Sequence, residues 1–96
     1  MPTYIALLKY TQQGAAKLKA SPKRLDSGRK LFEKAGAKIK DTYLTMGRYD
    51  LVCVIDAPDD ETYARLLLQL GSQGNVTTET LKAFTEDEFR KIVAAI

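Results

Sequence analysis

The chain has 96 residues, 45% of them hydrophobic and 28% charged, which fits one globular domain over residues 1–96 and excludes an intrinsically disordered chain. It contains no histidine and one cysteine, which excludes histidine-dependent catalysis, an intrachain disulfide and a cysteine–histidine zinc site, so we expect no cofactor. The net charge of +3 is unevenly spread. Residues 1–40 carry ten Lys/Arg against two Asp/Glu and residues 41–96 carry five against ten. This split can attract an anionic partner, can let neighbouring subunits attract one another, or can leave two solvated faces.

The first predicted element is a β-strand over residues 3–10, which has apolar residues at odd and even positions and so presents apolar surface on both faces. Residues 15–20 favour a short helical turn. A helix is predicted next, from Ser21 to about Ala35. Ser21 suits the N-cap, where its hydroxyl can accept a hydrogen bond from a free backbone amide, and Pro22 suits the first helical position.

Two strands joined by a tight turn are predicted in the middle of the chain. Residues 37–46 begin by alternating between apolar and charged side chains, which is typical of a strand with one partly exposed face. Residues 47–50 form the turn, and residues 51–57 form the most hydrophobic strand of the chain. We therefore expect the 51–57 strand at the centre of the sheet, antiparallel to its predecessor.

In the last part of the chain, the residue pattern predicts a helix, a strand and a short closing helix. The carboxylates of residues 59–61 favour a helix N-terminus, because they interact with its free amides and with its dipole. Residues 75–84 are rich in β-branched side chains and predict the fourth strand. Thr85 and Glu88 have capping-box spacing, so we expect residues 89–96 to close the chain as a helix.

This order of elements predicts an α+β protein with the ferredoxin-like βαββαβ fold: a four-stranded antiparallel sheet, two helices on one face and a short C-terminal helix. The other face of the sheet is then apolar and open, and an uncovered apolar face of this size usually marks an interface. Two such sheets packed face to face would form a dimeric α/β barrel. In an alternative arrangement, the C-terminal helix covers part of the open face.

Several ordered segments along the chain carry a resemblance to a known family. They are Pro2-Thr3-Tyr4, Ser21-Pro22-Lys23-Arg24, Met46 to Val52, Ala57 to Glu61, Gly71-Ser72 with Gly74-Asn75-Val76, and Thr78 to Leu81. Together they resemble the GYD domain family, whose name-giving letters correspond to Gly47, Tyr49 and Asp50. The resemblance covers essentially the whole chain. It implies the dimeric α/β barrel fold and implies no particular activity.

The tight turn holds the main candidates for a ligand site. Arg48 suits an anionic group, and Tyr49 and Asp50 add a phenol and a carboxylate. Tyr4 and Tyr43, on neighbouring strands, could add aromatic walls of the kind that line small-molecule sites. A structural interpretation stays open beside this one, in which the turn residues bond to backbone amides and the tyrosines pack in the core or at an interface.

Other chemistries are weaker candidates. Asp59, Asp60 and Glu61 could hold a hard cation, but a helix start explains them without one, and we expect no metal. Cys53 lies in an apolar run, where a thiol is a packing group and not a nucleophile. The basic residues between positions 17 and 40 have no exposed aromatic side chains among them for stacking bases, so nucleic acid binding is not expected.

The leading hypothesis is a non-enzymatic homo-oligomeric module that binds a small anionic or aromatic metabolite. Two alternatives stay open. One is a cofactor-independent enzyme, monooxygenase- or isomerase-like, with Tyr49 and Asp50 as acid and base, and the other is a structural or partner-binding subunit. We expect the chain to bind a second copy of itself. The sequence has no signal-peptide pattern at its N-terminus and no membrane-spanning segment, so we expect a cytoplasmic protein.

Overall fold

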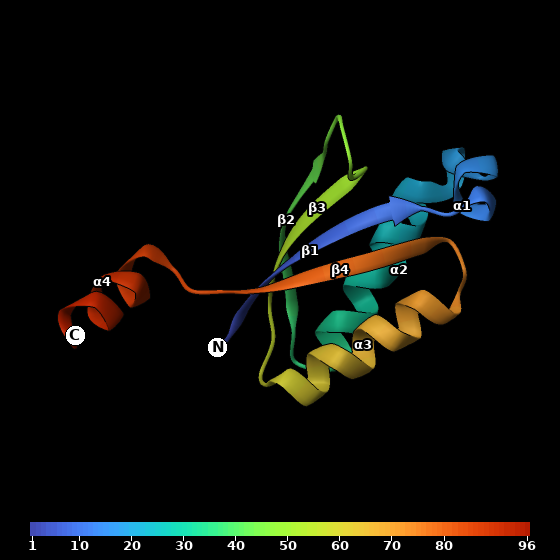
Figure 1. Cartoon of the computed structure of the whole chain (residues 1–96). Helices are drawn as coiled ribbons and strands as arrows, with labels where there is room; N and C mark the ends of the chain where they lie inside the picture. Colours follow the sequence, from blue (N-terminus) through green and yellow to red (C-terminus); the bar gives the residue numbers. More distant parts are fainter.

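The computed structural model describes all residues from 1 to 96 (Figure 1). Four strands and four helices make up the chain, with a short 3₁₀ turn, η1, between the first two helices. In chain order the elements are β1 (Thr3–Tyr10), α1 (Gln12–Ala16), η1 (Leu18–Ala20), α2 (Ser21–Lys34), β2 (Lys38–Leu44), β3 (Leu51–Asp56), α3 (Asp60–Ser72), β4 (Val76–Ala83) and α4 (Glu86–Ala94).

The four strands form one antiparallel sheet in the order β2-β3-β1-β4. The most hydrophobic strand, β3, therefore has a neighbour on each side, as expected of a central strand. The helices α2 and α3 lie on one face of the sheet, and the opposite face carries no helix (Figure 1). This arrangement confirms the predicted ferredoxin-like α+β fold.

The core lies between the sheet and the two helices. On β1, the side chains of Tyr4, Ala6 and Leu8 are buried on the helix side, because alternate residues of a strand face the same way. Phe32 of α2 and Leu66 of α3 are each 1% exposed and close the core from the other side. The whole core consists of Tyr4, Ala6, Leu8, Phe32, Ala37, Cys53, Ile55, Ala57, Tyr63 and Leu66.

The start of α2 differs from the prediction. Ser21 is the first residue of the helix and not its N-cap, a position that Ala20 takes without a side-chain hydrogen bond. The reason is that η1 leads directly into α2, so the backbone at Ser21 is already helical. The hydroxyl of Ser21 is instead hydrogen-bonded to the phenol of Tyr10 at 2.8 Å, which ties the start of the helix to the end of β1.

The starts of α3 and α4 confirm the predicted capping. Asp59 accepts a hydrogen bond from the backbone N–H of Thr62 at 2.7 Å. At α4, the Thr85 hydroxyl accepts from the N–H of Glu88 at 3.2 Å, and the Glu88 carboxylate accepts from the N–H of Thr85 at 2.8 Å. These bonds satisfy amides that the first turn of a helix leaves free. They also lower the pKa of the Asp59 and Glu88 carboxyls.

The helix α4 lies beyond the end of the sheet and covers neither of its faces (Figure 1). None of its residues is buried. The Cα radius of gyration is accordingly 14.3 Å, against about 12.5 Å for a compact domain of this length. The alternative in which the C-terminal helix covers the open face of the sheet is therefore wrong.

Candidate functional site

The turn between β2 and β3 gives its three candidate residues different surroundings. Arg48 is exposed and forms no ion pair. Tyr49 donates a hydrogen bond to the carboxylate of Glu79 on β4, and this bond raises the pKa of the phenol. Asp50 accepts a hydrogen bond from the backbone N–H of Tyr10 at 2.9 Å. Asp50 thus ties the turn to the end of β1. This bond matches the structural interpretation, in which the turn residues bond to backbone amides.

The other two candidates, Tyr43 and Tyr4, lie on opposite faces of the sheet. Tyr43 is 58% exposed and pairs with Val52, on the face that carries no helix. Tyr49 lies on this same face, because the ammonium of Lys9 is 5.5 Å from the centroid of its ring. Tyr4 is 3% exposed and lies on the helix side, so the sheet separates it from the other two tyrosines. Ligand binding by these residues stays a prediction.

Tyr4 takes part in a polar network at the N-terminus of α3. Its hydroxyl donates to the carboxylate of Asp60, which also accepts from the ammonium of Lys82 at 3.1 Å. Its ring stacks on that of Tyr63, with the centroids 4.0 Å apart. Burial and the bond to Asp60 raise the pKa of Tyr4 to about 12, and the same bond lowers the pKa of Asp60. The phenol is therefore a neutral donor at physiological pH.

The face of the sheet without helices has an apolar centre and a charged rim. The centre, which we call the open-face patch, consists of Ile5, Leu7, Val52, Val54 and Leu81. At one end of the rim, the ammonium of Lys40 lies 3.6 Å from the carboxylate of Asp56. At the other end, Lys9 and Glu79 flank Tyr49. An apolar centre inside a polar rim is typical of protein–protein interfaces.

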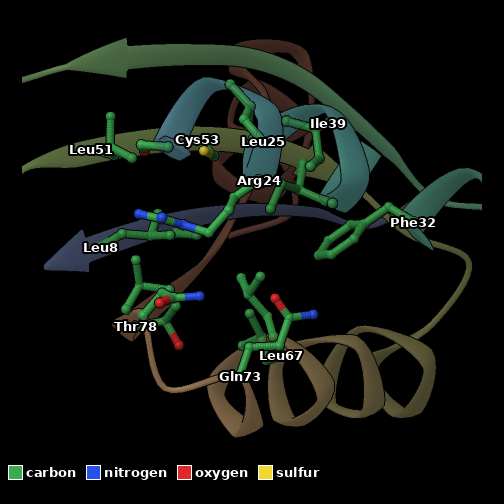
Figure 2. A pocket seen from close by; sticks show the side chains of 17 residues that line it. Leu8, Arg24, Leu25, Phe32, Ile39, Leu51, Cys53, Leu67, Gln73 and Thr78 are labelled. Atoms are coloured by element: carbon green, nitrogen blue, oxygen red, sulfur yellow. The ribbon is translucent and has the colours of Figure 1, made fainter. Parts of the chain in front are cut away.

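A cavity of about 70 Å³ lies between the sheet and the helices α2 and α3 (Figure 2). Most of its lining is apolar, with Phe32 at one end. The side chain of Arg24 extends along the cavity from α2, and Gln73, Asn75 and Thr78 add polar groups to the lining. No sequence motif marks this site or singles out Arg24 as its charged residue, because the lining comes from four strands and two helices.

The remaining candidates for chemistry have structural surroundings. Asp59 caps α3 and Asp60 pairs with Lys82, so the start of the helix accounts for both carboxylates. No cluster of three or more His, Cys, Asp or Glu side chains that could hold a metal ion is present. The thiol of Cys53 is buried, which raises its pKa. No helix has both the length and the apolar character that crossing a bilayer requires.

Comparison with known proteins places the chain in a family. The family model described as GYD domain matches residues 4–93, which is nearly the whole chain. The chain belongs to the GYD domain family. This membership confirms the resemblance carried by Gly47, Tyr49 and Asp50 together with the ordered segments around them.

This GYD domain is also similar to a protein of the bacterium Thermus thermophilus. The two sequences are 39% identical over 84 residues, which cover 86% of this chain and 88% of the relative. The relative is named glutamine synthetase and cystathionine beta-lyase binding protein. By its name, that protein binds two enzymes.

Two solved structures share the fold of this GYD domain. The crystal structure of TTHA0845 from Thermus thermophilus matches with a TM-score of 0.57 at 24% identity, covering 88% of this chain and 95% of that chain. The hypothetical protein PHS023 from Pyrococcus horikoshii matches with a TM-score of 0.55 at 18% identity, covering 90% of this chain and 93% of that chain. At these identities, the two structures bear on the fold alone.

Proposed function

We propose that this GYD domain is a self-associating binding module. Two copies pair through their open-face patches and close a dimeric α/β barrel, and the helix α4 of each copy docks on an enzyme. The observation that carries the proposal is a pair of separate apolar surfaces that no helix covers. One is the open-face patch, whose members are half-buried except for the exposed Leu81, and the other is the exposed apolar side of α4. The name of the Thermus relative supplies the class of partner, glutamine synthetase or cystathionine beta-lyase.

The exposed area of the chain, to which both the open face and α4 contribute, supports assembly with a partner. The solvent-accessible surface is 6702 Å², whereas a compact monomer of 10.7 kDa exposes about 5,500 Å². The excess of roughly 1,200 Å² is larger than the roughly 800 Å² that each partner of a standard protein complex buries. Excess surface of this size is expected of a chain that covers part of it in an assembly.

The open-face patch suits contact with a second copy of itself. A two-fold interface brings the same surface of both copies together, so an apolar centre packs on an apolar centre. Ile5, Val54 and Leu81 share one row across the sheet, and Leu7 and Val52 share the next. Face-to-face packing buries these rows against each other, which stabilises the pair, and leaves the charged rim in contact with water.

The helix α4 suits contact with another protein because one of its sides is apolar. Phe89, Ile92 and Val93 recur at helical spacing and are between 48% and 59% exposed. A helix of nine residues is marginal in water unless it packs on something. Amphipathic helices of this kind bind with their apolar side in a groove of the partner. The acidic first turn, residues 86–88, favours a groove with basic groups at that end.

The test is calorimetric titration of the chain with glutamine synthetase and with cystathionine beta-lyase from the organism that encodes it. We expect at least one of the enzymes to bind. Ile92→Glu places a carboxylate on the apolar side of α4 and should weaken this binding about 100-fold, without changing the mass of the chain in solution. Lys91→Gln, on the polar side of the same helix, is the matched control and should bind like the wild type.

Three outcomes contradict parts of this proposal. If neither enzyme binds, the partner class is wrong. If Ile92→Glu binds as tightly as Lys91→Gln, α4 is not the docking surface. If Ile92→Glu converts a dimer into a monomer, α4 contacts the second copy of the chain, and its assignment to an enzyme is wrong.

A second candidate function is the binding of a small anionic or aromatic metabolite. The cavity between the sheet and the helices favours it, because apolar walls with a few polar groups are the usual form of a small-molecule site. Arg48, Tyr43 and Tyr49, at the rim of the open face, are the alternative location. The two functions are compatible, since the cavity and α4 are separate parts of the molecule.

A further inference from the structure

We propose that the cavity between the sheet, α2 and α3 binds a small apolar carboxylate, with its carboxylate on Arg24 and its apolar part against Phe32. This inference rests on the second candidate function and names both the location and the ligand class. It places the site on the helix side of the sheet, away from the turn that holds Arg48 and Tyr49.

The charge of the lining favours an anion. Arg24 is the only charged residue among the 17 that line the cavity, and it forms no ion pair. Its guanidinium donates to the backbone carbonyls of Lys17 at 2.9 Å and Gly14 at 3.4 Å. A guanidinium has five N–H donors, so these two bonds leave three without a partner in the chain. A carboxylate would accept them in charge-assisted bonds, which are stronger than bonds between neutral groups.

The rest of the lining favours an apolar body of limited size. Figure 2 shows Phe32 and the guanidinium of Arg24 at opposite ends of the cavity, so a ligand that reaches both has one apolar end and one charged end. The walls between these ends include Leu25, Ile39 and Leu67. The volume of about 70 Å³ is about half of the roughly 150 Å³ that holds a benzene ring, so the cavity favours a short branched chain, and a ring fits only if the walls move apart. A nucleotide-sized cofactor is far too large for it.

Gly28 provides an independent argument. It lies in the interior of α2, where glycine lowers the stability of a helix relative to alanine. A Cβ atom added at Gly28 would meet no other atom within 4 Å, so packing does not require glycine there. Gly28 also lines the cavity. The missing side chain leaves free space in the wall, and a ligand would fill it.

The test uses two carboxylate probes and one uncharged analogue, added to the full chain and followed by NMR chemical shifts. The probes are 4-methylpentanoate and phenylacetate, and the analogue is phenylacetamide, which has nearly the shape of phenylacetate without its charge. We expect both acids to shift the resonances of Phe32 and Leu67. Phenylacetamide should bind about 10-fold more weakly than phenylacetate, because it loses the charge-assisted bonds.

Three variants test separately the charge of Arg24 and the free volume at Gly28. Arg24→Gln should remove the preference for phenylacetate over phenylacetamide, and comparing the two probes within this variant cancels any change in packing. Gly28→Leu puts a side chain into the cavity and should weaken both probes about 10-fold or more. Lys30→Gln, an exposed position of the same helix, is the matched control and should bind like the wild type.

Each contrary outcome has a distinct meaning. If phenylacetamide binds as tightly as phenylacetate and Arg24→Gln changes neither, the carboxylate assignment is wrong, while small-ligand binding by the cavity stands. If Gly28→Leu binds both probes like the wild type, the site lies elsewhere in the chain. If neither acid nor amide binds at about 10 mM, the inference fails, and the rim of the open face at Arg48 is the remaining location for the second candidate function.

Discussion

The two faces of one sheet have different surroundings in this GYD domain, although the same strands build both. On β1, Tyr4 and Ala6 are buried under the helices, whereas Ile5 and Leu7 are half-buried and belong to the open-face patch, which no helix covers. An antiparallel sheet with one solvated face normally alternates between apolar and polar residues. Apolar residues at both positions therefore indicate that the helix-covered face provides the stability of the single chain, while the open face is suited to association.

The largest expected effect comes from the covered face. Phe32→Ala removes a ring that is 1% exposed and should lower the free energy of unfolding by about 3–5 kcal/mol, through lost burial and the cavity left behind. Leu81→Ala, on the open face, should cost less than about 1 kcal/mol in dilute solution, with an effect that grows with protein concentration. Urea unfolding at several concentrations measures both. If both variants lose the same free energy of unfolding at every protein concentration, the two faces do not differ in the way described here.

A smaller effect is expected from Tyr4→Phe, which keeps the ring and removes the hydroxyl that donates to Asp60. The free energy of unfolding should fall by about 1–2 kcal/mol at pH 7. The fold raises the pKa of this phenol from 10.0 to about 12 and so favours its neutral form. This stabilisation is therefore present below pH 10 and is lost as the pH rises from about 10 to about 12.

Denaturant titrations of Tyr4→Phe and the wild type across this range check that sign. The two proteins should converge in stability at alkaline pH, because only the wild type loses the contribution of its phenol. A difference that stays constant from neutral to alkaline pH would show that the hydroxyl bond to Asp60 does not determine the titration.

Thr85→Ala tests the isolation of α4 from the rest of the molecule. It removes half of the capping box and should destabilise the helix locally by about 1 kcal/mol. Because α4 packs on no other element, hydrogen exchange should accelerate at residues 86–94 while the unfolding midpoint of the sheet and the other helices stays unchanged. Thr77→Ala, at an exposed position of β4, is the control and should leave hydrogen exchange at residues 86–94 unchanged. A lower midpoint for the whole chain would show that α4 contributes to the core.

The smallest expected effect is a gain. Gly28→Ala should raise the free energy of unfolding by about 0.5–1 kcal/mol, because alanine is the better helix former and the added Cβ meets nothing within 4 Å. Thermal unfolding measures it. A loss of stability would mean that the wall of the cavity at Gly28 is more crowded than this structure shows.

The fold could be predicted from the sequence where local signals determine it. The run of apolar residues located β1 at Thr3–Tyr10, and the capping-box spacing identified Thr85 as the N-cap of α4. The helix itself was predicted over residues 89–96 and begins earlier, at Glu86, directly after its cap. The prediction of Ser21 as an N-cap was wrong, because the conformation of Ser21 depends on tertiary contacts and not on the local sequence. The turn η1 precedes it, and its hydroxyl bonds to Tyr10. The Ser21-Pro22 pair in the sequence predicts neither the preceding turn η1 nor the hydrogen bond to Tyr10.

The candidate site was less predictable, since it depends on which side chains share a face. In β2, a bulge between Ile39 and Asp41 adds one residue and reverses the alternation that follows. Without the bulge, Tyr43 would lie on the helix side with Ile39 and Tyr4. The cavity at Arg24 left one trace in the sequence, Gly28, which lies on the side of α2 that turns Leu25 and Phe32 toward the cavity. A glycine in a helix indicates a site only once the open space beside it is known.

The measurement that tests the central claim most directly is the mass of the purified chain in solution, by light scattering over a dilution series, for the wild type and for Val54→Asp. The account predicts a wild-type mass about twice 10.7 kDa and a monomeric variant, because a carboxylate in the open-face patch cannot be buried without a partner. Ser27→Asp, an exposed position of α2, should stay dimeric as the matched control. A wild type that is monomeric at every concentration, or a Val54→Asp variant that stays dimeric, would contradict self-association through the open face.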